Sequence, residues 1–348
     1  MSPALYFAIP GDLESLTGGY AYDRRLIAEL RALGWEVTVV PLASGFPYPD
    51  AAALQAADAA LNAIPDEALV LVDGLALGAM DTVATQHSKR LRLVALCHHP
   101  LALESGLNEN TRTHFLQSEA TALSASRAIV VTSPASRALL THLFGIPATR
   151  ITVAVPGTDP APFAACEGQP PVLLCVATLT RRKGHDLLID ALAMLSHLEW
   201  QARFVGGDDF DPGWAQTLRE KIQGAGLQQR IVLTGSRKDL RAEYQGADIF
   251  VLPTRFEGYG MVFTEALSYG LPIVASQIEP VTEIVPPEAG LLVPAENSAA
   301  LASALERMLM DTTLRATLTQ GARESAENLP RWPDTATAVA RLLQEIVR

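Results

Sequence analysis

The stretch Phe256-Glu-Gly-Tyr-Gly-Met-Val-Phe-Thr-Glu-Ala-Leu267, closed by Gly270-Leu-Pro272, decides how the second half of the chain is interpreted. It follows the apolar run 248–253, which is typical of a buried strand. From Met261 onward apolar residues recur at helical spacing, and the closing glycine and proline predict where that helix ends. The stretch therefore predicts a strand, a glycine-containing turn and a helix.

Two glutamates lie on either side of the predicted helix start. Glu257 falls in the turn, and Glu265 lies one turn inside the helix. The backbone N–H groups from Gly260 to Val262 are unpaired donors at a helix N-terminus, where a phosphate binds favourably. Carboxylates on both sides can accept hydrogen bonds from hydroxyls, so the pattern fits a sugar nucleotide. The alternative is an ordinary helix whose first turn carries Glu because of the helix dipole.

The spacing of these glutamates resembles the signature of retaining glycosyltransferase family four, also described as glycosyl transferases group 1. That family has the α/β GT-B fold, with two Rossmann-like doubly wound domains facing across a cleft. The resemblance implies that Glu257 binds hydroxyls of the transferred sugar and that Glu265 binds the ribose hydroxyls. It also implies donor binding by the residues of the intervening turn, which are Gly258, Tyr259, Gly260, Met261 and Val262.

Length and composition describe a two-domain globular protein. The 348 residues exceed one ordinary core, and 49% hydrophobic with 19% charged residues is typical of a compact chain. A net charge of −11 disfavours nucleic acid as a partner and basic attachment to anionic lipid. We expect no membrane span and no signal peptide. Cys97, Cys166 and Cys175 form no C-x-x-C pair, so we expect free thiols and a cytoplasmic setting.

Six apolar runs alternate with helical patterns in the first half, which predicts a parallel sheet covered on both faces. The runs are 5–9, 36–40, 69–73, 91–97, 128–132 and 151–155. Ligands of such sheets bind at the carboxyl ends of the strands. Asp73, His98 and Ser133 lie at or just past such ends.

Gly18-Gly19 and His98-His99 are the candidates for function in this half. The glycine pair could form a plain turn, or a loop in which backbone approaches a phosphate or sugar. No G-x-G-x-x-G is present, which disfavours a nicotinamide cofactor. Adjacent histidines diverge and no third ligand is spaced nearby, so zinc is disfavoured. The family resemblance implies that Gly18 and Gly19 bind the donor and that His98 reaches the sugar. For His99 we expect the simpler role, that of a structural histidine at the strand end.

The second half repeats the alternation from the run 172–177. Arg181-Arg182-Lys183-Gly184 follows it, and a solvated corner is the simplest interpretation of three consecutive cations. The segment nevertheless resembles the family's Lys-Gly motif, whose cations neutralise the donor diphosphate. The family's Arg five residues before the Lys is Thr178 here, so either Arg181 or Arg182 would have to replace it. The resemblance also places the end of the strand 230–235, at Leu233 and Gly235, near the nucleotide base.

Further features concern domain boundaries and metals. Asp208-Asp-Phe-Asp211 invites a metal interpretation, but Pro212 and Gly213 indicate an exposed acidic loop instead. A proline-rich linker predicts a domain boundary after residue 162. The resemblance implies an acceptor domain at 1–162 and a donor domain at 163–330. The resemblance implies that a helix from Trp332, at 331–348, packs back on the first domain.

The function implied is transfer of a hexosyl unit, with retention, from a UDP- or GDP-sugar to an acceptor hydroxyl. Lys183, Glu257 and His98 would be the catalytic residues, with the leaving phosphate taking the acceptor proton. We expect neither a metal nor a cofactor apart from the nucleotide sugar. The acceptor loops would be 11–20, 44–50 and 100–110, and the acidic composition slightly favours a soluble acceptor over a lipid. A noncatalytic nucleotide-sugar sensor and a GT-B epimerase are the alternatives.

Overall fold

The structure is a computed structural model that describes residues 3–104 and 106–347. Met1, Ser2, Ser105 of the expected acceptor loop 100–110, and Arg348 of the expected C-terminal helix lie outside the described residues. The chain divides into two compact units: one runs up to Gly157 and resumes at Pro330, and the other is Thr158–Leu329. The irregular segment 154–171 contains both this division and the boundary that the sequence predicts after residue 162.

The first unit is built on a six-stranded parallel sheet with the strand order β2-β1-β3-β4-β5-β6. Its strands are β1 (Ala4–Pro10), β2 (Glu36–Leu42), β3 (Leu69–Asp73), β4 (Arg92–Cys97), β5 (Ala128–Val131) and β6 (Ile151–Val153). All six predicted runs form strands. Every residue of β3 and β5 is buried, as expected of strands covered on both faces.

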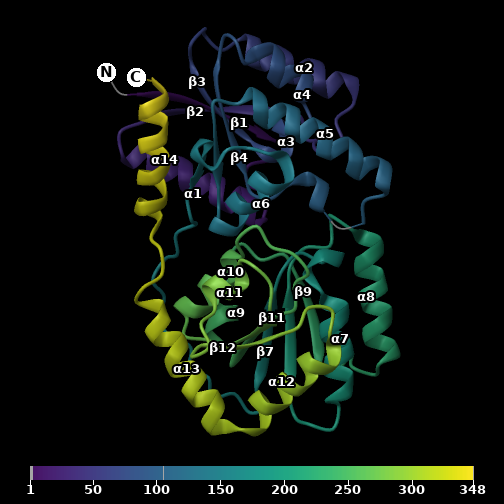
Figure 1. The fold of residues 1–348 in the computed structure, drawn as a ribbon. Helices are drawn as coiled ribbons and strands as arrows, with labels where there is room; N and C mark the ends of the chain where they lie inside the picture. The colour runs from purple at the N-terminus through teal and green to yellow at the C-terminus, as the bar shows by residue number, and fades with distance from the viewer. Residues whose placement is uncertain (1–2, 105, 348) are drawn as a thin grey trace. The chain divides into compact units, whose positions relative to one another are not determined.

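Helices of the first unit cover this sheet (Figure 1). They are α1 (Gly18–Ala32), α2 (Ala51–Asn62), α3 (Gly74–Leu77), α4 (Asp81–His87), α5 (Glu109–Ala125), α6 (Pro134–Phe144) and α14 (Trp332–Val347), with the short turns η1 (Leu101–Leu103) and η2 (Ala148–Arg150). The winding direction changes between β1 and β3, which places a topological switch point at their carboxyl ends.

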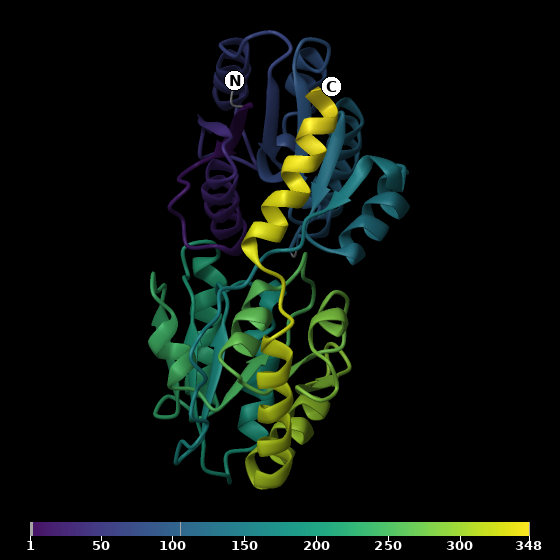
Figure 2. The same cartoon turned by 90° about the vertical axis from the view of Figure 1, so that its left-hand side faces the viewer.

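The C-terminal helix α14 completes the first unit. It packs against α1 and β6, and both views show it beside α1 (Figures 1 and 2). Thr335 Oγ1 donates a hydrogen bond to the Val155 carbonyl at 2.6 Å, and the ring centroids of Trp332 and Tyr22 lie 5.7 Å apart. A Cβ on Gly157 would lie 2.1 Å from the Trp332 nitrogen, so glycine is needed where the two segments touch.

The second unit has its own six-stranded parallel sheet, in the order β12-β11-β10-β7-β8-β9. The strands are β7 (Val172–Val176), β8 (Gln201–Val205), β9 (Ile231–Gly235), β10 (Ile249–Leu252), β11 (Ile273–Ser276) and β12 (Gly290–Val293). The helices are η3 (Arg181–Lys183), α7 (His185–Met194), α8 (Pro212–Gly224), α9 (Arg241–Gln245), α10 (Met261–Ser268), α11 (Val281–Ile284), α12 (Ser298–Met310) and α13 (Thr312–Ala326). The winding direction of this sheet changes between β7 and β10, which places its topological switch point at their carboxyl ends.

Helix α13 is one of the helices that the apolar pattern does not predict. Leu314, Leu318 and Ala322 recur at four-residue spacing and pack on the core. Because Thr319 and Gly321 are buried beside them, the apolar stripe is narrow. The start of the helix is defined instead by Asp311, whose carboxylate accepts a hydrogen bond from the Leu314 nitrogen at 2.9 Å. A Cβ on Gly321 would lie 1.9 Å from the Glu288 carbonyl oxygen, so the helix packs closely there.

The sequence predicts that the cysteines are free thiols and that no segment spans a membrane. Cys97 and Cys175 are buried and Cys166 is half-buried, and all three are free. Within 3–104 and 106–347, no helix combines the length and the apolar character needed to cross a membrane.

Candidate functional site

Two loops meet at the carboxyl ends of β7 and β10, the strands that flank the switch point of the second sheet. One contains η3 and the other runs from Pro253 to Gly260. Gly184 allows their contact, because it has φ 70° and a Cβ on it would lie 2.0 Å from the Pro253 carbonyl oxygen. The Arg255 nitrogen donates a hydrogen bond to the Arg182 carbonyl at 2.8 Å, which joins the loops further.

Lys183 and Glu257 form an ion pair where these loops meet. The Lys183 Nζ lies 2.6 Å from Glu257 Oε1, and an Arg182 Nη1 lies 3.6 Å from Glu257 Oε2. Only 6% of the Glu257 side chain is exposed. Burial alone would raise the pKa of this carboxyl, but the charges of Lys183 and Arg182 hold the pKa below its ordinary value. Glu257 is therefore an anion that both cations share.

The structure distinguishes the two arginines that the sequence left open. Arg182 faces Glu257, and its Nη1 also donates a hydrogen bond to the Phe256 carbonyl at 2.9 Å. The Arg181 guanidinium lies instead over the ring of Trp214 on α8, 4.2 Å from the ring centroid, and the residue is exposed. Of the two, Arg182 is placed with the charged group.

The start of α10 lies in the second loop, as the glycine pattern predicts. Gly260 has φ 97°, a left-handed conformation, and no side chain within 3–104 and 106–347 caps the helix. Met261 and Val262 are half-buried in its first turn, and Tyr259 is buried just before it. The first backbone N–H groups of an α-helix without a side-chain cap are available to an anion.

Glu265 has a partner that the sequence did not indicate. The Tyr244 hydroxyl on α9 donates a hydrogen bond to Glu265 Oε2 at 2.7 Å, and the Tyr244 ring stacks on Tyr269 with centroids 5.0 Å apart. Burial raises the pKa of Glu265, although the hydrogen bond from Tyr244 opposes this. The Tyr244 hydroxyl thus fixes the position of the Glu265 carboxylate, because the Tyr244 ring is fully buried.

Leu233 and Gly235 lie on β9, at the edge of the sheet. Leu233 is half-buried against the core, and the Gly235 carbonyl accepts a hydrogen bond from the Gly206 nitrogen at 3.1 Å. A Cβ on Gly206 would lie 1.8 Å from the Ala177 carbonyl oxygen, so the ends of β7, β8 and β9 are close together. The role of Leu233 and Gly235 in base binding stays a prediction.

A second charged group lies in the first unit, at the carboxyl ends of β3 and β4. His98 Nε2 is 3.1 Å from Asp23 Oδ1 and 3.4 Å from Asp73 Oδ2. Asp23 is fully buried on α1, and Asp73 is the last residue of β3. The Tyr22 ring contacts His98 edge-on, with centroids 5.3 Å apart. His99, the other member of the pair, instead contacts Glu104 at 3.0 Å.

The expected loop at Gly18-Gly19 is wrong, because both glycines belong to α1. Thr17 is the extended residue before the helix, and the glycines occupy its first turn. Tyr20 defines the loop before the helix by donating a hydrogen bond to the Pro10 carbonyl at 2.7 Å. A Cβ on Gly19 would lie 3.4 Å from His98 Cδ2, whereas one on Gly18 would contact nothing within 4 Å. Of the glycine pair, Gly19 lies against His98.

The search for a third ligand near His98 also needs correction. Ligand atoms of Asp23, Asp73 and His98 lie within 4.8 Å of one another, close enough to hold a metal ion. Asp23 is 75 residues from His98 in sequence, so a search of neighbouring positions misses it. The sequence places Asp73 at a strand end but gives no sign that it contacts His98. The only available signal was the sheet topology, which places β3 beside β4 near the switch point.

Family models match both units of the chain. Residues 163–325 match the model described as Glycosyl transferases group 1, and residues 18–162 match Glycosyltransferase Family 4. The chain belongs to glycosyltransferase family 4. Its two six-stranded Rossmann-like domains are the GT-B fold of this family.

Curated relatives of this glycosyltransferase family member have different acceptors in their names. The lipopolysaccharide core biosynthesis mannosyltransferase LpsB of Rhizobium meliloti is 29% identical over 201 residues, covering 55% of this chain and 54% of that protein. The D-inositol 3-phosphate glycosyltransferase of Jonesia denitrificans is 30% identical over 237 residues, covering 61% and 55%. The chain thus aligns with about half the length of these relatives.

Solved structures support the same GT-B fold along the whole chain. Sucrose-phosphate synthase from Thermosynechococcus elongatus superposes with a TM-score of 0.83 at 23% identity, covering 99% of both chains. Anabaena Alr3699/HepE, solved in complex with UDP and glucose, superposes with a TM-score of 0.77 at 19% identity, covering 99% of this chain and 100% of that one. At these identities the likeness concerns the fold.

The acidic loop of this glycosyltransferase has structural roles. The Asp211 carboxylate caps α8 by accepting a hydrogen bond from the Trp214 nitrogen at 2.9 Å, and Asp208 pairs with Arg219. Two of the three carboxylates of the Asp-Asp-Phe-Asp sequence, those of Asp208 and Asp211, thus have protein partners.

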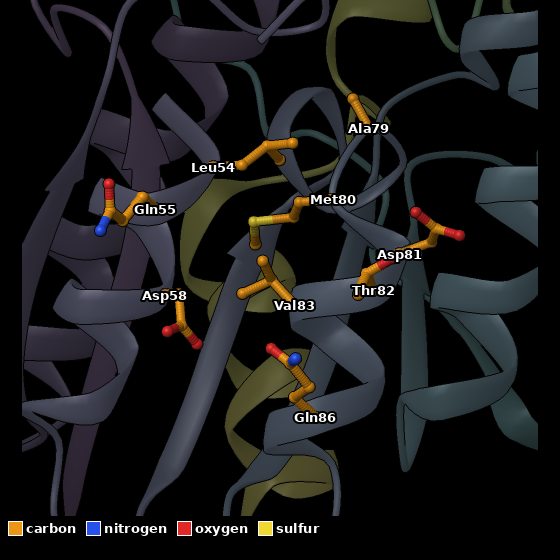
Figure 3. A pocket seen from close by; sticks show the side chains of 9 residues that line it. All are labelled: Leu54, Gln55, Asp58, Ala79, Met80, Asp81, Thr82, Val83 and Gln86. Atoms are coloured by element: carbon orange, nitrogen blue, oxygen red, sulfur yellow. The ribbon is translucent and has the colours of Figure 1, made fainter. Parts of the chain in front are cut away.

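One surface pocket lies apart from both charged groups. It has a volume of about 320 Å³ and lies between α2 and α4, where Figure 3 shows Met80 and Val83 in the middle, with Gln55 and Asp58 to one side. None of the predicted donor-binding or catalytic residues lines it. Asp58 at this pocket also pairs with the buried His87, at 2.7 Å from its Nε2.

Proposed function

We propose that this chain is a retaining glycosyltransferase that moves a hexosyl unit from a UDP- or GDP-sugar to an acceptor hydroxyl without a metal ion. The observation that carries the proposal is the group formed by Lys183, Arg182 and Glu257 beside the start of α10. Two cations, a buried carboxylate and free helix N–H groups are concentrated at the switch point of the second sheet. The nucleotide sugar is the co-substrate, and no other cofactor is proposed.

The cations would stabilise the leaving diphosphate. As the bond between the anomeric carbon and the diphosphate oxygen breaks, negative charge accumulates on that oxygen, and preorganised positive charge lowers the barrier. Lys183 is already oriented by its contact with Glu257 and is 13% exposed, so an arriving phosphate would find its ammonium group in place. Arg182 and the N–H groups of Met261 and Val262 would add further donors.

The transfer itself needs no protein nucleophile in this proposal. The acceptor oxygen forms a bond to the anomeric carbon on the face from which the diphosphate leaves, so configuration is retained. The acceptor proton passes to the departing phosphate oxygen, which balances the charge. Glu257 would accept hydrogen bonds from sugar hydroxyls, and Glu265, held by Tyr244, would accept them from the ribose.

The acceptor is proposed only as a class. The names of the relatives include D-inositol 3-phosphate and mannosylfructose-phosphate, which suggests testing phosphorylated polyols alongside the lipopolysaccharide core. The acidic composition supports a soluble acceptor over a lipid. Three free cysteines fit a reducing compartment, and we propose that the protein acts in the cytoplasm.

A thermal-shift screen with UDP, GDP, ADP and their common sugar conjugates tests donor binding. A ligand that binds only the folded state at 100 times its Kd adds about 2.7 kcal/mol of stability. Glu306→Gln serves as a control, because this exposed residue on α12 is outside the donor loops. A shift with UDP or GDP conjugates that is lost in Glu265→Gln and kept in the control supports the site. No shift with any nucleotide would contradict it.

Turnover then separates the transferase from a noncatalytic sensor. The selected donor is incubated without acceptor, and release of the nucleoside diphosphate is followed. We expect slow hydrolysis, unchanged by EDTA, that increases when an acceptor from the panel is added. A protein that binds the donor but releases no diphosphate under any of these conditions would be a sensor. The anomeric configuration of the product, determined by NMR, tests retention.

A further inference from the structure

Arg255 connects three segments of the second unit. It lies in the loop after β10, and its guanidinium contacts Asp186 in the first turn of α7 and Glu296 in the loop between β12 and α12. Nη1 and Nη2 each donate a hydrogen bond to one Asp186 carboxylate oxygen at 2.9 Å, which makes this contact bidentate. Nη2 also donates to Glu296 Oε2 at 3.1 Å, and Nε donates to Glu296 Oε1. One side chain thus joins the loops after β10 and β12 to the start of α7.

Arg255 also contacts the backbone of η3, the segment that carries Lys183. Its Nη1 donates a hydrogen bond to the Arg181 carbonyl, and its main-chain nitrogen donates to the Arg182 carbonyl at 2.8 Å. These carbonyls belong to the two residues before Lys183, and Glu257 follows Arg255 by two residues. The contacts of Arg255 therefore lie directly beside the ion pair of Lys183 and Glu257, on both segments that form it.

The guanidinium of Arg255 is fully used by the protein. An arginine side chain carries five N–H donors in fixed directions. The five hydrogen bonds to the two carboxylates and to the Arg181 carbonyl account for all of them. Arg255 is therefore not placed to bind a phosphate itself, and any effect on a bound donor would pass through the segments that it holds.

We propose that Arg255 is a positioning residue of the donor site: it holds η3 against the loop after β10 and thereby keeps the Lys183 ammonium in place. The catalytic part of this inference rests on the proposed transferase function, whereas the control of Lys183 by Arg255 does not. A lysine side chain is long and flexible, so an ammonium group that is oriented before the donor binds needs a fixed backbone. Arg255 supplies that constraint.

The contact with Asp186 should matter more than the contact with Glu296. The side chains of Arg255 and Asp186 are 25% and 19% exposed, whereas that of Glu296 is 57% exposed. Exposed ion pairs contribute little, because water and salt screen them. Burial alone would raise the pKa of Asp186, but the hydrogen bonds from Arg255 hold this pKa below its ordinary value, so Asp186 is an anion at neutral pH.

Amine labelling of the full-length protein without any ligand tests the control of Lys183. The four lysines of the chain are Lys89, Lys183, Lys221 and Lys238. An amine-reactive ester, followed by mass spectrometry, gives the labelling rate at each of them. In Arg255→Gln the rate at Lys183 should rise at least about fivefold, because amines react in their uncharged form and the pair with Glu257 favours the charged one. The other three lysines should keep their wild-type rates.

Two milder variants test the order of the contacts and cover the case in which Arg255→Gln fails to fold. Labelling of Lys183 should be faster in Asp186→Asn than in Glu296→Gln, since the Asp186 contact is the more buried one. The double variant Asp186→Asn/Arg255→Gln should label Lys183 as Arg255→Gln does, because Asp186 acts through Arg255. Independent, additive effects would contradict that coupling.

Arg230→Gln is the matched structural control. Arg230 is also half-buried, and it donates hydrogen bonds to the carbonyls of Ser196 and Trp200, with its guanidinium 3.6 Å from the Trp200 ring centroid. It directly precedes β9, so it lies at the amino ends of the strands, away from the donor loops. Its loss should lower the thermal unfolding midpoint but leave the labelling of Lys183 unchanged.

The kinetic readout tests the catalytic part. With the donor selected by the thermal-shift screen, kcat of Arg255→Gln should fall at least about tenfold while KM for the donor changes less than about threefold, since oriented cations act mainly on the charge that develops in the transition state. Arg230→Gln should keep the wild-type kcat. An unchanged kcat in Arg255→Gln would overturn the catalytic part.

Two labelling results would overturn the control of Lys183 by Arg255. One is a wild-type rate at Lys183 in folded Arg255→Gln and Asp186→Asn proteins. The other is an equal acceleration in Arg230→Gln, which would mean that any loss of stability exposes Lys183. Both results are obtained without donor or acceptor, so they are distinct from a failure of the proposed transfer reaction. A protein without turnover whose Lys183 responds to Arg255 would contradict the transferase and not the positioning.

Discussion

Lys183 and Glu257 lie 74 residues apart in the sequence, yet the Lys183 Nζ and Glu257 Oε1 are 2.6 Å apart in the structure. The pair joins the loops that follow β7 and β10, the two strands at which the second sheet changes its winding direction. A phosphate arriving at Lys183 would meet a cation that is already oriented. The same contact keeps a carboxylate buried and charged, so it affects stability as well as binding.

Glu257→Gln should change the acid sensitivity of the protein. The pKa of Glu257 is held below its ordinary value in the folded protein. Its contribution to stability is therefore present above the unfolded-state pKa, near 4.5, and is lost as the pH falls through the lower folded-state pKa. At pH 7 we expect the variant to be less stable by about 1 to 3 kcal/mol, because two cations lose a charged partner.

Urea unfolding at pH 7, 5 and 3.5 measures this difference. The stability gap between wild-type protein and Glu257→Gln should narrow as the pH falls, because the wild-type carboxyl becomes neutral too. A gap that is the same at all three values would mean that the ion pair contributes nothing that depends on the charge of Glu257.

The two neighbouring arginines should differ sharply when each is changed to alanine. Arg182 lies with Glu257 and Arg181 lies over Trp214. If the diphosphate binds at this group, Arg182→Ala removes a charge-assisted contact and should weaken nucleoside diphosphate binding about tenfold or more. Arg181→Ala should weaken it less than about threefold, since its guanidinium is exposed and screened. Calorimetric titration of both variants decides, and equal losses would contradict the assignment.

The sequence predicted the fold well because the signals involved are local. Apolar runs such as 69–73 and 249–252 mark buried strands, and glycines such as Gly260 mark helix starts with left-handed backbone. The glycine pair Gly18-Gly19 misled because glycine in the first turn of a helix has the same local pattern as glycine in a loop. Helix α13 is hard to predict because its buried residues are few and partly polar.

The contacts within the site could be predicted only in part. The family motif indicated Lys183, Glu257 and Glu265, but it could not say that Arg182 rather than Arg181 would join them. The partners Asp23 of His98 and Tyr244 of Glu265 come from distant parts of the chain. Such pairs follow from the order of strands in the sheet, which a single sequence does not display.

Tyr244→Phe should weaken nucleotide binding without disturbing the aromatic stack. The variant keeps the ring that packs on Tyr269 but removes the hydrogen bond to Glu265 at 2.7 Å. Loss of one such bond, about 1 kcal/mol, corresponds to a roughly fivefold higher Kd. The pKa of Glu265 should also rise further, because Tyr244 opposes the effect of burial. Binding should therefore weaken at a higher pH than in the wild-type protein as the solution is acidified.

Tyr269→Phe is the matched control for this variant. It removes a hydroxyl for which no hydrogen bond is found among the described residues, while the stacking is kept. Titrations of the selected nucleotide between pH 5 and 8 should give wild-type affinity for this control. If both tyrosine variants bind like the wild-type protein, the proposed contact of Glu265 with the ribose does not depend on Tyr244.

Gly184→Ala should destabilise the second unit and the donor loops together. The residue has φ 70°, and its Cβ would lie 2.0 Å from the Pro253 carbonyl oxygen, a backbone atom that cannot rotate away. A left-handed alanine costs about 1 to 2 kcal/mol and overpacking about 1 to 3 more, so a loss of roughly 2 to 5 kcal/mol is expected.

Gly224→Ala, at the exposed end of α8 with no atom near its Cβ, should be neutral or slightly stabilising. Urea unfolding of both variants, followed by Trp fluorescence, provides the comparison. A Gly184→Ala protein as stable as the Gly224→Ala protein would show that the loops after β7 and β10 can separate freely, and then Lys183 and Glu257 would not be held together by the fold.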